Sequence, residues 1–167
     1  MLKKYTRQML ISSMYAVVTL LIAPASFGPI QFRVSEALMV LVLFDYDNIY
    51  GLSLGCFLAN LIGLLSGVNP IGVMDIVFGT CATFISGVWM YNLKDLKFKD
   101  LPLLSLLMPA VFNGIIVGLE LALIFNESDL IVYWLIYGFQ VFVGELAVLL
   151  VVGTAVYLAL KKIKFDG

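Results

Sequence analysis

Long apolar stretches separated by short polar ones dominate the pattern of this chain. A helix needs about 20 mostly apolar residues to cross the hydrocarbon layer of a membrane, and most of these stretches are that long. Proline and glycine mark the breaks, at Pro24 and Gly28 after the first stretch and at Pro70 after the third. The pattern predicts six membrane-spanning helices, over residues 8–27, 32–48, 49–67, 72–92, 101–124 and 130–160.

Two of these predicted helices have unusual lengths. The apolar core of the second, from Val34 to Phe44, is shorter than a perpendicular span requires. We retain it because removing one crossing would put the basic residues 94–99 on the other side of the membrane from the basic N-terminal residues. The last predicted helix, over 130–160, is longer than the hydrocarbon layer is thick. It should therefore be tilted or project beyond the membrane.

Nine of the ten basic residues gather in three short clusters at predicted helix ends. The clusters are Lys3, Lys4 and Arg7, then Lys94, Lys97 and Lys99, and last Lys161, Lys162 and Lys164. Short segments rich in Lys and Arg stay in the cytoplasm, and six crossings place all three clusters on that side. We therefore expect an all-α membrane protein in the cell membrane, one domain over residues 1–167, with both termini cytoplasmic.

The composition excludes several classes of function. The chain is 62% hydrophobic and 13% charged, against roughly 25% charged for a soluble domain. It contains no histidine, which excludes HExxH metal sites and the usual nucleophile–histidine pairs. It also lacks a P-loop sequence, so any ATP hydrolysis would fall to partner subunits. We expect no enzyme activity, no cofactor and no bound metal, and we interpret Cys56 and Cys81 as reduced thiols.

Small residues recur at every fourth position of the third predicted span, as Gly51, Gly55, Ala59, Gly63 and Gly67. Shorter stripes of the same kind occur in the fourth and fifth spans. Such stripes let helix backbones approach closely in lipid, and we interpret these three as packing within the chain. Ser12 and Ala16 repeat the spacing near the cytoplasmic end of the first span. There we predict the docking of a partner protein.

Polar side chains inside the predicted spans are few and lie mostly in the outer half. An ionised group near the bilayer centre costs on the order of 3 kcal/mol, so such groups persist when paired or when they line a cavity. Arg33 and Glu36 are three positions apart, and one interpretation is an ion pair between them. Asp75, Glu120 and Glu145 then have no basic residue left in the spans. A positively charged ligand rich in donors would satisfy them, and polar contacts between helices are the alternative.

Aromatic rings near these groups favour a flat heterocycle as ligand, because rings stack on its faces while carboxylates and amides bind its edge. The candidate binding residues are Arg33, Glu36, Asn60, Asp75, Asn113, Glu120, Trp134, Tyr137, Gln140 and Glu145.

Three segments of the chain resemble the QueT family, the substrate-specific S components of energy-coupling factor (ECF) transporters. They are residues 26–38 (SFGPIQFRVSEAL), 51–60 (GLSLGCFLAN) and 74–79 (MDIVFG), with a weaker likeness at Gly144-Glu145-Leu146. The resemblance implies six helices, both termini inside and a pocket facing outward. It implies a queuosine precursor as ligand, a 7-deazaguanine with an aminomethyl or a cyano group.

The same resemblance implies three partner subunits, a transmembrane coupling subunit and two ATPases. The family commonly docks through two alanines four residues apart in the first helix, where this chain has Ser12 and Ala16. A cationic aminomethyl group and a guanine-like edge with two N–H donors would suit carboxylates. We expect no nucleic acid as a partner.

The main alternative is a self-sufficient secondary transporter that uses Asp75, Glu120 or Glu145 to carry protons for a small cationic or heterocyclic solute. Such a protein would show an inverted repeat with broken helices in corresponding places. The sequence has no such internal symmetry. A purely structural membrane subunit is a further alternative, and the gathering of carboxylates in the outer half argues against it.

Overall fold

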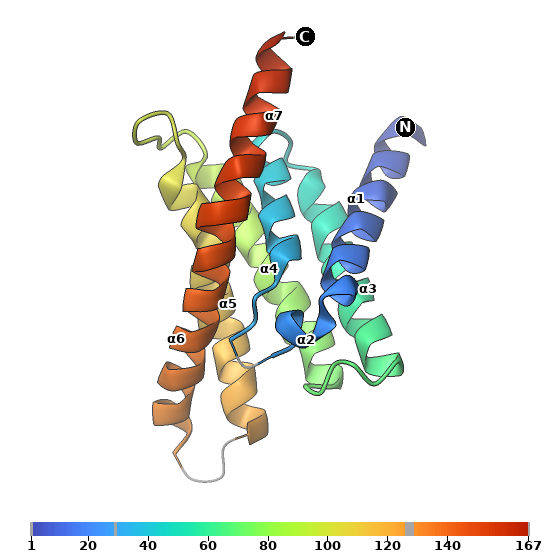
Figure 1. Cartoon of the computed structure of the whole chain (residues 1–167), viewed down its shortest axis with the longest axis vertical. Helices are drawn as coiled ribbons and strands as arrows, with labels where there is room; N and C mark the ends of the chain where they lie inside the picture. Colours follow the sequence, from blue (N-terminus) through green and yellow to red (C-terminus); the bar gives the residue numbers. More distant parts are fainter. Residues whose placement is uncertain (1, 29, 126–128, 167) are drawn as a thin grey trace.

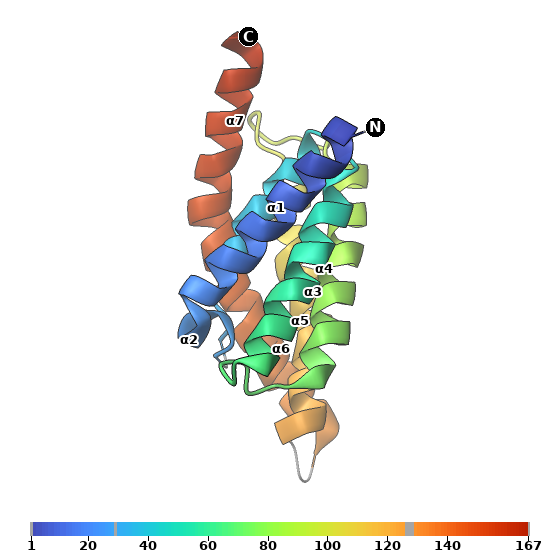
Figure 2. The same ribbon diagram turned by 90° about the vertical axis from the view of Figure 1, so that its right-hand side faces the viewer.

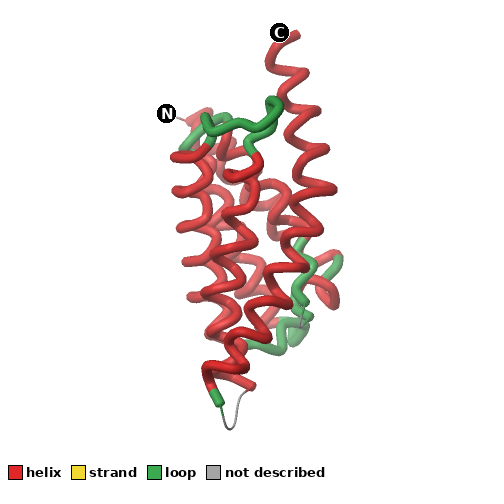
Figure 3. The backbone as a smooth tube through the Cα atoms, turned by 90° about the vertical axis from the view of Figure 1, so that its left-hand side faces the viewer, coloured by secondary structure: helices red, strands yellow, loops and turns green. Residues whose placement is uncertain are grey.

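The structure is a computed structural model that describes residues 2–28, 30–125 and 129–166, with side chains up to Ile163. Helices make up 82% of it, and the described part contains no strand (Figure 3). The elements are α1 (Leu2–Leu21), α2 (Ala23–Ser26), the 3-10 helix η1 (Val34–Leu43), α3 (Asn48–Leu65), α4 (Val73–Leu93), α5 (Leu103–Phe125), α6 (Leu130–Val148), the π-helical segment η2 (Leu149–Gly153) and α7 (Thr154–Asp166).

Four helical stretches within the described residues are long and apolar enough to cross a membrane. They are Asn48–Leu65, Val73–Leu93, Leu103–Phe125 and Leu130–Ile163. The prediction of an all-α fold is therefore confirmed for the described residues, and the four stretches fit the predicted multi-pass membrane protein. The remaining two predicted crossings correspond to α1 and to the shorter apolar helix Val34–Leu43, and the number six stays a prediction.

Neighbouring long helices pack in chain order, α1 on α3, α3 on α4, α4 on α5 and α5 on α6. The short helix η1 lies in the middle and contacts α1, α3, α4, α6 and α7, and α1 runs obliquely across the bundle (Figure 2). The start of α1, the end of α7 and the loop between α4 and α5 all lie at one end (Figure 1). The three basic clusters thus share an end, as predicted, and the side of the membrane that this end faces stays a prediction.

The second predicted helix differs most from expectation. Residues 32–48 were predicted as an ordinary membrane helix, but η1 is a 3-10 helix of only 10 residues. With a rise of about 2.0 Å per residue it reaches about 20 Å, less than the ~30 Å hydrocarbon layer. An apolar pattern alone does not distinguish this tight helix from an α-helix.

The first and last helices also extend beyond their predicted bounds. α1 already begins at Leu2, so the basic cluster around Lys4 is helical. The helix ends at Leu21, and the short helix α2 follows from Ala23. α6, η2 and α7 follow one another without a gap, and the stretch Leu130–Ile163 has 34 residues. At about 1.5 Å per residue this stretch exceeds the hydrocarbon layer. Figure 1 shows α7 projecting past the other helices, in agreement with the prediction.

The small-residue stripes pack within the chain, as predicted. A Cβ atom on Gly51 would lie 2.5 Å from Gln8 Oε1, and one on Gly118 would lie 2.4 Å from the Cα atom of Gly138. Gly67 is the exception in the third span, because it has open space around it and a φ of +75°. It therefore ends α3 in a conformation that favours glycine.

The predicted docking stripe on the first helix is not accessible. Ser12 and Ala16 are only 2% and 6% exposed, and the backbone of Ser12 lies against Gly55 of α3. The prediction that these two residues face outward toward a partner is wrong. The reason is that α3 carries its own small residues, so the two stripes pack on each other. The partner itself stays a prediction.

Candidate functional site

The segment between α2 and η1 carries the first site residues into the bundle. A Cβ atom on Gly144 would lie 2.1 Å from the carbonyl oxygen of Ile30, so the absence of a side chain there lets the segment lie directly on α6. Gln31 follows with a φ of +50° and is buried, and Arg33 comes immediately before η1. This path places a guanidinium inside the bundle, where apolar helices surround it.

Arg33 is the centre of a buried polar cluster. It is 1% exposed, and among the described residues the other buried charged side chains are all acids: Glu36, Asp75, Glu120 and Glu145, each 0% exposed. Arg33 interacts electrostatically with all four. Its guanidinium carbon also lies 5.7 Å from the centre of the Phe27 ring. One cation therefore faces four carboxyl groups that come from η1, α4, α5 and α6.

Asp75, in the first turn of α4, is the acid closest to Arg33. Its Oδ2 atom lies 3.5 Å from Arg33 Nη2 and accepts a hydrogen bond from Asn69 Nδ2 at 2.8 Å. The side chain of Asn60, on α3, donates to the backbone carbonyl of Asp75 at 2.6 Å. A Cβ atom on Gly79 would lie 2.8 Å from Asp75 Oδ1 and Asn60 Nδ2. The glycine at this position thus lets α3, α4 and the loop between them close around the carboxylate.

Glu36 is held by hydroxyl groups and not by Arg33. The Tyr15 hydroxyl of α1 donates a short hydrogen bond to Glu36 Oε1, and the Thr83 hydroxyl of α4 donates to the same oxygen at 3.2 Å. The Oε2 atom of Glu36 has no hydrogen-bond partner. The predicted Arg33–Glu36 ion pair is therefore wrong. Arg33 has non-helical backbone angles, φ −86° and ψ 85°, so the helical three-residue spacing does not apply to it.

Glu120 of α5 and Glu145 of α6 have the fewest partners in the cluster. No oxygen of either carboxyl group accepts a hydrogen bond of normal geometry. Glu120 interacts electrostatically with Asp75 and Arg33, and Glu145 with Glu36 and Arg33. Asn113 of α5 lies beside Glu145 and interacts with its carboxyl group, but neither polar atom of the Asn113 side chain makes a hydrogen bond of normal geometry. Buried groups of this kind need a compensating partner, because an unmet hydrogen bond in an apolar interior is costly.

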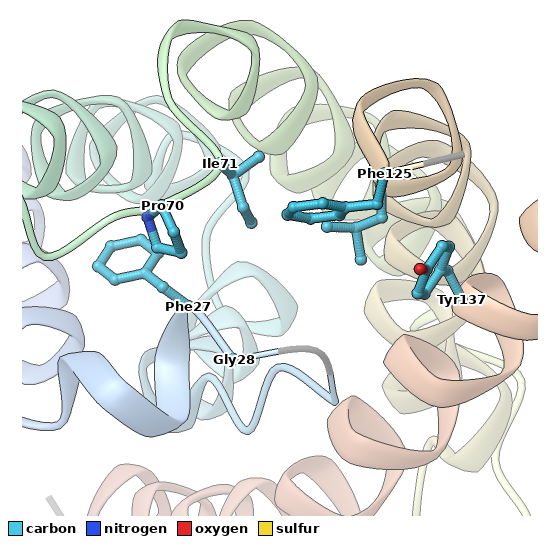
Figure 4. A pocket seen from close by; sticks show the side chains of 7 residues that line it. Phe27, Gly28, Pro70, Ile71, Phe125 and Tyr137 are labelled. Carbon is cyan, nitrogen blue, oxygen red and sulfur yellow. The ribbon is translucent and has the colours of Figure 1, made fainter. Parts of the chain in front are cut away.

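A cavity of about 280 Å³ lies next to the cluster, at the end opposite the basic residues. Its walls include Phe27, Ile71, Leu121, Phe125 and Tyr137. Figure 4 shows the rings of Phe27 and Tyr137 on opposite sides of this space, with Phe125 between them. The described lining of the cavity is aromatic and apolar and includes none of the cluster's carboxyl or amide groups. Phe27 connects the two regions, since its ring lines the cavity and also lies under Arg33, and an aromatic surface of this kind suits a flat ligand.

The structure thus brings most of the predicted site residues together. Arg33, Glu36, Asn60 and Asp75 are in direct or shared contact, and Asn113, Glu120 and Glu145 face them from α5 and α6. Tyr137 lines the cavity. Gln140 is half-buried with an unpaired Oε1 atom. Trp134 lies elsewhere: it lines a groove between α5 and α6 and donates its indole N–H to the carbonyl of Ile115 at 2.9 Å.

Sequence reasoning missed four participants. Tyr15 and Thr83 hold Glu36, Asn69 holds Asp75, and Gln31 is buried with its Nε2 atom unpaired. Asn69 carried a usable signal, since it precedes Pro70 at the mouth of a loop, where a side chain often bonds to the backbone. Indeed the backbone N–H of Ile71 donates to its Oδ1 atom at 3.0 Å. Tyr15 and Thr83 carried none, because each is an ordinary residue of an apolar helix.

Within the described part of the chain, no group of three or more Cys, Asp and Glu side chains is placed to hold a metal ion. Cys56 is buried and lies 3.6 Å from both Arg33 Nη1 and Asn60 Nδ2, while Cys81 is exposed on another face. The two thiols are free, as predicted.

The family model described as QueT transporter matches residues 5–162 of this chain. No curated protein and no solved structure gives a match. The matched range covers every residue of the buried polar cluster and of the cavity wall.

Proposed function

Because this chain belongs to the QueT transporter family, we propose that it is the substrate-binding S component of an ATP-driven ECF importer. The ligand we propose is a queuosine precursor, 7-aminomethyl-7-deazaguanine or its 7-cyano analogue, taken up from outside the cell. Membership of a transporter family and the four apolar spans make the chain a multi-pass membrane transporter. The S-component role and the ligand are the proposal.

The excess of buried carboxyl groups over cations carries this proposal. Four buried acids interact electrostatically with Arg33, and the oxygens of Glu120 and Glu145 accept no hydrogen bond of normal geometry. Ionised carboxyl groups persist in an apolar interior when donors or positive charge satisfy them. A guanine-like edge presents two adjacent N–H donors, which match the two oxygens of one carboxylate. A protonated aminomethyl group would meet a second carboxylate.

The position of the cavity supports a flat ligand that enters from the end opposite the basic clusters. Its volume of about 280 Å³ is near the lower limit of known small-molecule pockets, about 300–1,000 Å³. A pocket of this size suits a small ligand such as a single bicyclic ring. Phe27 and Tyr137 offer faces for stacking. If the basic clusters are cytoplasmic, as their Lys content favours, this cavity opens toward the outside.

Energy for uptake must come from other chains in this proposal, since the sequence has no P-loop. We propose a transmembrane coupling subunit and two ATPases as partners. Because Ser12 and Ala16 are buried, the contact on α1 falls to its exposed side, which carries Met9, Met14 and Val17.

Calorimetry with 7-aminomethyl-7-deazaguanine tests the site on purified protein. Glu145→Gln is the most informative variant, because its carboxyl group accepts no hydrogen bond and its loss should disturb the fold little. Binding should weaken roughly tenfold to a hundredfold, the cost of one hydrogen bond to a charged group. Glu36→Gln and Asp75→Asn should also weaken binding, each checked for folding. Asp100→Asn, an exposed acid at the opposite end, is the control and should bind as the parent does.

Two results would contradict the proposal. If all three carboxyl variants bind the ligand as tightly as the parent, the acids only hold helices together and the site lies elsewhere. If cells without any ATPase partner still take up the ligand, the chain transports by itself, as the proton-coupled alternative requires. Titration with the 7-cyano analogue then separates the two substituents, because only the aminomethyl form carries the positive charge.

A further inference from the structure

A second pocket lies at the other end of the molecule, among the basic residues. We call it the basic pocket; its volume is about 220 Å³. Lys94 and Lys97, from the end of α4 and the loop after it, and Lys161 of α7 form one part of its lining. Leu43, Phe44 and Tyr157 form an apolar part. Segments far apart in the chain therefore meet to build it.

The lysines of the basic pocket form no ion pair with a described residue. Three ion pairs occur among the described residues, Lys4–Asp47, Arg7–Asp45 and Arg33–Asp75, and none includes a pocket lysine. Asp95 also lines the pocket, so the described part of the lining has three lysines and one aspartate. Lys94 Nζ lies 3.5 Å from the centre of the Tyr91 ring, and Lys94 and Lys161 are half-buried. Partly buried ammonium groups that form no ion pair favour the binding of an anion.

The apolar part indicates what kind of anion fits. Phe44 and Tyr157 pack with their ring centres 5.9 Å apart, and Tyr157 is 5% exposed. A small inorganic anion would make no favourable contact with these apolar side chains. A molecule with an anionic head and a hydrocarbon body would contact both the lysines and the apolar part of the pocket. The pocket also lies where the apolar spans end, between the last residues of α4, Pro102 before α5 and the side of α7. Because the apolar spans end here, we expect this pocket to lie at the depth of the lipid headgroups.

We propose that the basic pocket binds the phosphate headgroup of an anionic phospholipid. In this arrangement Lys94, Lys97 and Lys161 surround the phosphate, and the glycerol and first acyl carbons lie on Phe44 and Tyr157. Basic pockets between helices at the membrane surface bind anionic lipid headgroups in this way. The basic pocket is separate from the buried polar cluster, and this proposal does not depend on which substrate the transporter takes up.

The experiment measures phosphatidylglycerol retained by the full chain in detergent, by native mass spectrometry, with phosphatidylcholine as the neutral comparison. The pocket variant is Lys94→Gln/Lys97→Gln/Lys161→Gln. The matched control is Lys3→Gln/Lys99→Gln/Lys162→Gln, which removes the same charge from exposed lysines at the same end. Each lysine near an anionic headgroup changes affinity about fivefold, so the pocket variant should bind about a hundredfold more weakly. The control should change phosphatidylglycerol binding by less than about threefold.

Each other outcome overturns the proposal. Equal losses in both triple variants would mean attraction by overall charge, without a site. Phosphatidylcholine bound as well as phosphatidylglycerol would remove the role of the headgroup charge. Full displacement by sn-glycerol 3-phosphate would mean a site for a free phosphate compound. Unchanged lipid binding with lost co-purification of other subunits would assign the lysines to a protein contact. If the pocket variant fails to fold, Lys97→Gln alone, at an exposed position, should still weaken binding about fivefold.

Discussion

Replacing Arg33 by methionine removes the one cation from the buried polar cluster. Methionine fills similar space without charge, so the perturbation is mainly electrostatic. Four fully buried acids then remain together, and Asp75 loses the guanidinium that lies 3.5 Å from its Oδ2 atom. We expect Arg33→Met to lower the free energy of unfolding strongly, by more than a typical single substitution.

The magnitude follows from the distance and the burial. Two unit charges 3.5 Å apart attract by about 5 kcal/mol at an effective dielectric constant of about 20. Removing one partner of a buried pair costs about 3–5 kcal/mol in proteins, because the other charge stays buried without compensation. The second variant, Asp75→Asn, neutralises that stranded acid. Arg33→Met/Asp75→Asn should therefore recover about 2–3 kcal/mol relative to the sum of the single variants.

The assay is a double-mutant cycle in mixed micelles, with unfolding by SDS followed by circular dichroism. Arg7 and Asp45, which lie outside the four apolar stretches long enough to cross a membrane, supply a control cycle. They lie closer together, at 2.5 Å, but are 46% and 37% exposed. Solvent screening limits such a pair to about 0.2–1 kcal/mol. If the Arg33 and Asp75 effects add within about 0.5 kcal/mol, the buried pair contributes no coupling and our account of the cluster is wrong.

The control cycle also has a defined pH dependence. The hydrogen bond from Arg7 is the main cause that lowers the pKa of Asp45 below its usual value. A carboxyl group with a lowered pKa in the folded state stabilises the fold above the unfolded pKa, about 3.9 for Asp. Its contribution is lost as the pH falls below that value, toward the folded pKa. The small Arg7–Asp45 coupling should therefore be present at pH 7 and decline below about pH 4.

Two further predictions concern packing and topology. Gly118→Ala should destabilise the protein by about 1–3 kcal/mol, because its new Cβ atom would lie 2.4 Å from the backbone of Gly138. Gly153→Ala is the control and should be tolerated, because the nearest atom to its new Cβ atom is 3.7 Å away. The same SDS titration measures both. A cysteine at Val68, which is 44% exposed in the loop between α3 and α4, should react with an impermeant thiol reagent on intact cells, and one at Lys97 should not. Asn69 is unsuitable for labelling because it is only 4% exposed and holds Asp75. A cysteine at Ser128, which lies outside the described residues, should also react, and labelling at Lys97 would refute the predicted orientation.

The long helices were predictable because length and apolar composition suffice to define them. The predicted spans 72–92 and 101–124 correspond to Val73–Leu93 and Leu103–Phe125 within two residues. η1 was predicted only as an ordinary span, since a 3-10 helix has no apolar signature of its own. The exposure of Ser12 and Ala16 was mispredicted because a stripe of small residues indicates close helix packing but not whether the partner is another helix of the same chain or another protein. Here α3 covers it.

The sequence allowed us to predict which residues form the candidate site, but not which of them interact with one another. Every buried charged residue among the described ones had been a candidate, because charge inside an apolar span is itself unusual. The partners depend on where the backbone bends. Arg33 lies outside the helix that contains Glu36, so it reaches Asp75 of α4 instead. Trp134 shows the reverse error, since its place on a helix that carries site residues does not make it face the site.

The individual carboxyl oxygens distinguish the structural role of the cluster from its proposed role in ligand binding. Asp75 uses Oδ2 for Arg33 and Asn69, and Glu36 uses Oε1 for Tyr15 and Thr83. The second oxygen of each accepts no hydrogen bond, nor does either oxygen of Glu145. Substitution at Asp75 or Glu36 should thus change both folding and binding, while substitution at Glu145 should act mainly on binding. Ranking the variants by the ratio of these two effects tests the assignment without knowing which ligand group each acid meets.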